Sequence, residues 1–191
     1  MPQDTRERML ATTQELLLKH GLHGTSLNDI LSRSGAPRGS LYYYFPRGKA
    51  QLAFEATALG VEMVTQALEE LLDKERPPVA VRAYFDAAAS ALRESDFVFG
   101  CPVAPLVLDI DDPGAELAEL CRKTIARWQK MLRDAFVNAG IPTARAASLA
   151  TLTVSALEGA LLIARTERST QPISVVAEEV TALIEGALSP K

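Results

Sequence analysis

The stretch that decides the fold is residues 24–49, which read GTSLNDILSRSGAPRGSLYYYFPRGK. Ser26 precedes the apolar residues of a short helix, and Asp29 follows it at the spacing of a capping box. Gly35 ends this helix, because glycine readily adopts the conformation that a helix C-terminus needs. Pro37 begins the next helix, where its missing N–H costs nothing. A helix near 27–35, a turn at 34–36 and a short helix near 37–44 together make a helix-turn-helix.

The two short helices have an apolar inner face and a polar outer face. The apolar residues lock them onto a preceding helix near 4–20, and these are Leu27, Ile30, Leu31, Leu41 and Phe45. The outer face of the second helix carries Arg38, Ser40, Tyr42, Tyr43 and Tyr44. Three consecutive tyrosines do not all fit inside, since neighbours on a helix point about 100° apart. Tyrosine hydroxyls donate to phosphates and the rings reach base edges, so this face is a candidate DNA surface. We expect one aromatic residue, Tyr44 or Phe45, to pack inside instead.

Helical periodicity continues through the rest of the chain. It predicts helices near 49–74, 79–94, 115–139, 143–165 and 174–188, and a short helical piece that ends near 110. No stretch shows the sustained two-residue alternation of a strand. We therefore expect an all-α chain of about nine helices, with a DNA-binding head at 1–48 and a larger helical bundle at 49–191.

The composition excludes several classes of protein. With 191 residues, 48% of them hydrophobic, the chain is neither disordered nor collagen-like. Cys101 and Cys121 are too few for a disulfide framework, and with two histidines they make no evident zinc site. Uncharged runs stop at 12 residues, so we expect no membrane span, and the charged N-terminus is unlike a secretory signal. These features predict a cytoplasmic protein.

The charge is distributed unevenly. The net charge of −4 divides into +3 for residues 1–49 and −7 for residues 50–191. A basic head on an acidic body suits a protein whose head meets a polyanion. A difference of this size also arises by chance, so charge alone does not decide the matter.

The pattern over residues 5–55 resembles the DNA-binding domain of TetR-family transcriptional regulators. The resemblance rests on Met9-Leu10, Leu16-Leu17, Gly21-Leu22-His23-Gly24-Thr25-Ser26-Leu27 and the run from Gly35 to Pro46. It implies a dimer that binds operator DNA and a helical ligand-binding body. Phe45-Pro46-Arg47-Gly48-Lys49 and Gly100-Cys101-Pro102-Val103 are similar to the LmrA/YxaF-like branch.

The resemblance assigns roles to residues of the head. It implies that Thr25 and Lys49 contact phosphates. It also implies that the second short helix faces the groove with Arg38, Gly39, Tyr42 and Tyr43. Ser40 lies on the same outer face of that helix. Three positions depart from the family pattern. Pro37 replaces a Ser or Thr, Tyr44 stands where His is common, and one extra residue precedes Lys49, which makes Arg47 an alternative phosphate contact.

Large and adaptable side chains of the body are candidates for lining a ligand cavity. They are Met63, Phe85, Phe97, Cys101, Leu106, Trp128 and Met131. The alternative is that they are ordinary core, as such residues at helical spacing usually are. Trp128 needs a partner for its N–H if it is buried.

The last two helices carry more apolar residues than one core-facing stripe requires. We expect a two-fold dimer interface built from Leu152, Ala156, Gly159, Ile163, Val176, Val180, Leu183 and Ile184. The alternative is that both helices only complete the monomer's core.

These patterns favour a ligand-responsive transcriptional regulator, and specifically a repressor, that binds a near-palindromic operator as a homodimer and leaves it when a small apolar or aromatic molecule binds. An architectural or partner-controlled DNA-binding protein without a ligand is the alternative. A helical enzyme that uses Cys101 is disfavoured, because no basic residue stands near it in sequence to activate the thiol. No phosphate loop, dinucleotide fingerprint or paired-histidine motif is present, so no cofactor and no metal are expected.

Overall fold

Local capping signals fix the first three helices where the sequence predicts them. The computed structural model describes residues 4–112 and 115–188. Helix α1 (Thr5–His20) ends at Gly21, which has φ +69°. Helix α2 (Leu27–Ser34) is capped by Ser26, whose Oγ accepts the Asp29 N–H at 3.1 Å. Helix α3 (Arg38–Tyr44) follows Pro37, which stands at its N-cap.

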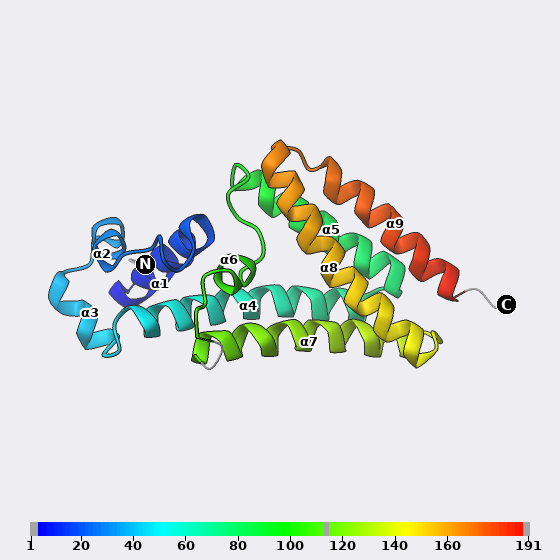
Figure 1. The fold of residues 1–191 in the computed structure, drawn as a ribbon, viewed down its shortest axis with the longest axis horizontal. Coiled ribbons are helices and arrows are strands. Elements are labelled where there is room, and N and C mark those ends of the chain that lie inside the picture. The colour runs from blue at the N-terminus through cyan, green and yellow to red at the C-terminus, as the bar shows by residue number, and fades with distance from the viewer. Residues whose placement is uncertain (1–3, 113–114, 189–191) are drawn as a thin grey trace. The chain divides into compact units, whose positions relative to one another are not determined.

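The remaining helices are close to the predicted ranges. They are α4 (Lys49–Lys74), α5 (Pro77–Glu94), α6 (Ala104–Val107), α7 (Glu116–Asn138), α8 (Thr143–Glu167) and α9 (Gln171–Leu188). Helix α5 begins two residues before the predicted start, because Pro77 and Pro78 occupy its first turn, where proline is tolerated. The described residues thus form nine helices and no strand, which confirms the predicted fold class (Figure 1).

The chain divides into two compact units, each built from two segments. Unit 1 comprises Met1–Glu62 and Cys101–Arg122, and unit 2 comprises Met63–Gly100 and Lys123–Lys191. In unit 1, α1 packs against α2 and α6. In unit 2, α5, α8 and α9 lie side by side (Figure 1). Helices α4 and α7 contribute residues to both units.

Buried threonines are part of the core in several helices. Thr13, Thr57 and Thr153 are almost fully buried, and each donates its hydroxyl proton to the carbonyl oxygen four residues earlier, at 2.7–2.8 Å. This bond satisfies the hydroxyl inside its own helix, so a threonine can occupy a core position without a distant partner.

Helix α8 is long and apolar enough to cross a membrane by length and composition, and it is the one such helix in the described ranges. The count of uncharged runs did not select this helix, because Glu158 divides its apolar stretch. Only 39% of that window is buried within the chain. One side of α8 packs against α5 and α9. The other side leaves apolar residues exposed, and these are Leu152, Leu162 and Ile163.

Candidate nucleic-acid interface

The helix-turn-helix is held together by a small apolar core. Ile30 of α2, Leu41 of α3 and Phe45 just after α3 are at most 2% exposed, as predicted. Gly35 has φ +63°, a left-handed conformation that allows the sharp turn between α2 and α3. The inner face of α3 is therefore occupied, and only its outer face is available to a partner.

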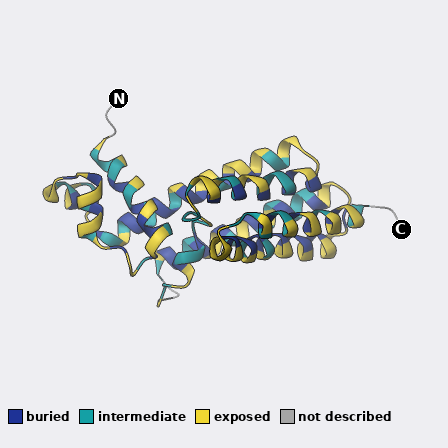
Figure 2. Cartoon of the chain, turned by 90° about the horizontal axis from the view of Figure 1, so that it is seen from above, coloured by how far each residue is buried: buried dark blue, intermediate teal, exposed yellow. Residues whose placement is uncertain are grey.

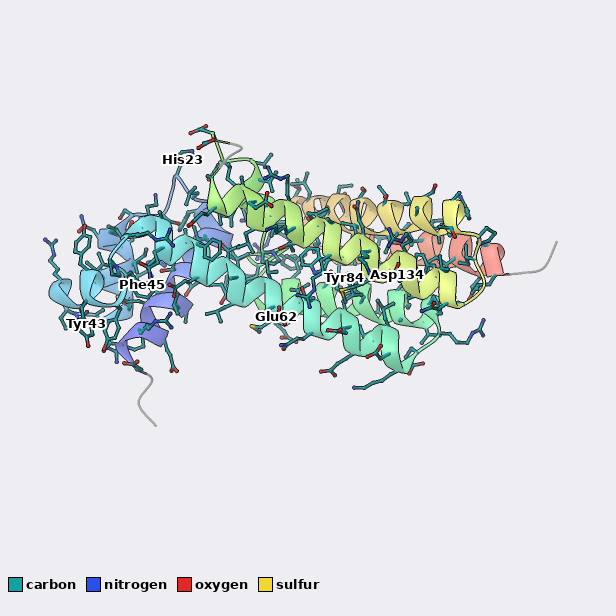
Figure 3. All side chains as sticks on the ribbon, turned by 90° about the horizontal axis from the view of Figure 1, so that it is seen from below. His23, Tyr43, Phe45, Glu62, Tyr84 and Asp134 are labelled. Atoms are coloured by element: carbon teal, nitrogen blue, oxygen red, sulfur yellow. The ribbon has the colours of Figure 1, made fainter. Side chains whose placement is uncertain are left out.

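Aromatic side chains dominate the outer face of α3. Tyr43 is 78% exposed and Tyr42 is 63% exposed. Tyr44 is half-buried and meets the Tyr43 ring edge-on, with ring centroids 4.9 Å apart. In Figure 3, Tyr43 lies at the outer edge of the head. Arg38 and Gly39 are exposed at the start of the same helix. Such a face can donate hydroxyl and guanidinium protons to phosphates or to base edges in a major groove.

Two hydroxyls proposed for this surface are engaged within the chain. Ser40 is half-buried and donates to Pro37 O at 2.6 Å. Thr25 is 1% exposed and donates to Gly21 O at 2.7 Å. Because the Thr25 hydroxyl is buried and its proton is used, we withdraw its side chain as a phosphate contact. The residue instead closes the turn between α1 and α2.

The basic residues of the head differ in what they do. Arg6 pairs with Glu55, Arg8 donates to Ser34 O at 3.1 Å, and Arg33 lies 4.0 Å from Glu15, so these three hold the head together. Two further basic residues are candidates for contact with DNA. Arg38 donates to Asn28 Oδ1 at 3.3 Å, and Lys49 is half-buried at the first residue of α4.

Several contacts of the head lay beyond sequence reasoning. Arg47 pairs with Glu116 at the start of α7 over 2.6 Å. Asp109 accepts the His23 N–H at 3.1 Å, and Asp111 lies 3.5 Å from His23 Nε2. The partners stand 69 to 88 residues apart in sequence, and no local motif links them.

Comparison with known proteins agrees with this geometry. The sequence model for bacterial regulatory proteins of the tetR family matches residues 9–56. The model for the C-terminal domain of LmrA/YxaF-like transcriptional regulators matches residues 77–179, which is more than half of the chain. The chain belongs to the TetR family. The predicted family and branch are both confirmed. Because these models describe transcriptional regulators and not enzymes, we withdraw Cys101 as a candidate nucleophile.

Individual TetR-family relatives cover nearly the whole chain. The HTH-type transcriptional regulator YxaF of Bacillus subtilis is 31% identical, with 95% of each chain covered. A regulator of Mycobacterium tuberculosis is 35% identical, again with 95% of each covered. The solved structure of reduced NemR of Escherichia coli matches with a TM-score of 0.77 and 26% identity over 93% of this chain and 95% of that chain. NemR is named an HTH-type transcriptional repressor.

The residues predicted to line a ligand cavity fall into different environments. Phe85, Leu106 and Trp128 are at most 2% exposed. Phe97, Cys101 and Met131 are half-buried, and Met131 lines an open groove of about 330 Å³ in unit 2. Cys101 and Leu106 belong to unit 1 and the others to unit 2.

Met63 and Trp128 are the two informative cases. Met63 is 68% exposed, so its expected inward orientation is wrong, because the buried stripe of α4 runs through Val61 and Thr65 instead. Trp128 is buried and donates its N–H to Thr65 Oγ1 at 2.8 Å. The predicted need of Trp128 for a partner is therefore met inside unit 2.

The residues predicted for dimerisation divide between core and surface. Val180 and Ile184 are at most 3% exposed and belong to the core stripe of α9 together with Ile173 and Ala177. They cannot also face a second chain, so their assignment to the interface is wrong. In Figure 2 buried and exposed residues alternate along each helix, as this division requires.

The other predicted interface residues retain some exposure. Leu152, Ile163 and Leu183 are 40–48% exposed, Gly159 is exposed with nothing within 4 Å of where its Cβ would stand, and Ala156 and Val176 are half-buried. Leu162 and Val175, which the sequence reasoning omitted, are 69% and 50% exposed on the same two helices.

Proposed function

We propose that this protein is a cytoplasmic repressor that binds a near-palindromic operator as a homodimer and releases it when a small apolar or aromatic molecule binds. Residues 1–48 bind DNA, and residues 49–191 bind the ligand and form the dimer. The observation that carries the proposal is the exposed outer face of α3, where Arg38, Tyr42 and Tyr43 stand on a helix whose inner face is packed.

Dimerisation is supported by the apolar residues that α8 and α9 leave exposed. Five large side chains on these helices are 40–69% exposed, namely Leu152, Leu162, Ile163, Val175 and Leu183. An apolar surface of this kind is costly in water and usually marks an interface. A two-fold dimer covers it with an identical surface from a second chain.

Operator recognition follows from the dimer. Two α3 helices related by a two-fold axis read two half-sites in inverted orientation, about one or more helical turns apart. Repression is the direction that the named activity of NemR supports.

Ligand control is the part with a competing alternative. Phe85 and Trp128 are large apolar side chains inside unit 2, and an aromatic molecule could pack against them. Both are already fully packed, and the Trp128 N–H already has its partner. This packing favours an architectural or partner-controlled factor without a ligand as the second candidate.

Selection from random DNA duplexes tests the proposal. The purified protein should enrich a near-palindrome. Arg38→Ala and Tyr43→Ala should each weaken specific binding by about 1–3 kcal/mol. Lys19→Ala is the matched control, because it also removes one positive charge from an exposed site, but on α1. Enrichment of no motif would contradict the proposal, and an equal loss in all three variants would reduce it to non-specific binding.

A further inference from the structure

Arg47 stands in the turn that joins the recognition helix α3 to α4. The backbone of this turn is fixed without the guanidinium. Gly48 has φ +60°, and the Arg47 N–H donates to Gln51 Oε1 at 3.2 Å. Gln51 in turn donates to Glu55 Oε1 at 2.8 Å. The Arg47 side chain is therefore not needed to shape the turn and is available for another purpose.

The guanidinium of Arg47 is held by a carboxylate from a distant helix. Arg47 Nη1 lies 2.6 Å from Glu116 Oε2, and the two side chains are 58% and 65% exposed. Both residues belong to unit 1. An exposed pair of this kind stabilises the folded protein by a factor of only about 1.4 to 5 in an equilibrium constant. The pair is weak enough for another anion to displace Glu116.

We propose that Glu116 competes with the operator DNA for Arg47, which the resemblance to the family already makes an alternative phosphate contact. This inference rests on the proposed function. Arg47 is exposed, and it stands three residues after α3 and two before Lys49, which are themselves candidates for contact with the duplex. A guanidinium binds a phosphate through two parallel N–H donors, as it binds a carboxylate. The same group cannot serve both anions fully.

Glu116 gives α7 a means of controlling the head. It is the first residue of a continuous helix that ends at Asn138 and carries Trp128. With the first turn of α7 in its present position, Arg47 Nη1 and Glu116 Oε2 are 2.6 Å apart, so the competing pair is formed and opposes DNA binding. A movement away from Arg47 releases the guanidinium to the phosphate.

Operator affinity measured over a range of salt concentrations tests the proposal, with the full-length protein and a duplex that it selects. Glu116→Gln should raise affinity about two- to fivefold at low salt, and the gain should shrink as salt screens the pair. Glu119→Gln is the matched control, because it removes the same charge from the same turn of α7 but from a residue paired with Arg122. It should change affinity less than Glu116→Gln does.

Arg47→Gln isolates the phosphate contact. It should lower affinity and reduce the slope of log K against log salt by about 0.9 for each protomer. Adding Glu116→Gln to Arg47→Gln should then have no effect, because the competed group is gone. Circular dichroism should show unchanged helix content in all variants, since every altered side chain is exposed.

Three outcomes would overturn the inference. An unchanged slope in Arg47→Gln excludes the phosphate contact. An equal gain from Glu116→Gln with and without Arg47 shows a general charge effect instead of competition. A wild-type protein that binds no duplex specifically removes the proposed function itself, and this inference with it.

Discussion

Trp128 donates its indole N–H to Thr65 Oγ1 over 2.8 Å, and both side chains are buried in unit 2. The bond joins α7 to α4 across 63 residues of sequence. It is a buried polar contact within a core that is otherwise mostly apolar, and its donor is the chain's single tryptophan.

Thr65→Val should destabilise the protein by about 1–3 kcal/mol, because it leaves the buried Trp128 N–H without an acceptor. Thr65→Ser keeps the hydroxyl and should lose much less. Denaturant unfolding followed by Trp128 emission measures both variants. Equal stability of the valine and serine variants would mean that the hydrogen bond contributes nothing.

Gly21→Ala should lower stability by about 1–3 kcal/mol. Gly21 has φ +69°, and a Cβ there would meet the Asp109 carboxylate. Gly39→Ala is the contrast, because Gly39 lies inside α3 with open space around it, and alanine is the better helix former. The midpoint temperature of thermal unfolding should therefore fall in the first variant and stay level or rise in the second.

Two neighbouring residues of α9 separate the proposed dimer surface from the core. Leu183 is 42% exposed, whereas Ile184 is fully buried. Leu183→Glu should give a folded monomer, and Ile184→Glu should unfold the chain by burying an unpaired charge. Sedimentation combined with circular dichroism distinguishes these results. A wild-type monomer at micromolar concentration would contradict the dimer directly.

The two cysteines should differ in reactivity. Burial raises the pKa of the Cys121 thiol above its ordinary value, so less of the reactive thiolate is present at neutral pH. Cys101 is half-buried. Iodoacetamide at pH 7.5 should modify Cys101 at least about tenfold faster than Cys121. Mass spectrometry of the labelled peptides measures the ratio, and unfolding in guanidinium should remove the difference.

Ligand control predicts a linked change in operator affinity and Trp128 emission. An aromatic effector should lower operator affinity by about 1–3 kcal/mol, and it should raise the melting temperature because it binds the folded state. If effective compounds leave Trp128 emission unchanged, the cavity does not lie near Trp128. If a broad screen finds no compound that alters operator affinity, the factor without a ligand becomes the better description.

The head was predictable because its signals are local. Ser26, Gly35 and Pro37 each fix a helix end through bonds within a few residues, and the structure places those ends within one residue of the expectation. The outer face of α3 followed from helical geometry alone. The burial of Thr25 and the bond from Ser40 to its own backbone were harder to foresee, since a hydroxyl serves equally well as a surface donor or as a donor to a nearby backbone carbonyl.

The body was less predictable because apolar residues occur on more than one side of its helices. In α4 the buried stripe passes through Thr57, Gly60 and Thr65, none of which a search for large apolar residues selects. Such a search chose Met63 instead. In α9 the stripe through Val180 and Ile184 was taken for the interface, because periodicity reveals that a stripe exists but not what covers it.

The division of unit 1 into two separate segments affects the order in which it can fold. The ribosome makes α1 to α4 before it makes residues 101–122, which supply α6 and the Asp109 contact to His23. During that interval the surface of α1 that packs against α6 has no cover. The DNA-binding motif is therefore fully synthesised before the second segment of unit 1 is available to pack against it. A fragment that ends after α4 should show the helices of the head but lower resistance to proteolysis than the same residues in the full chain.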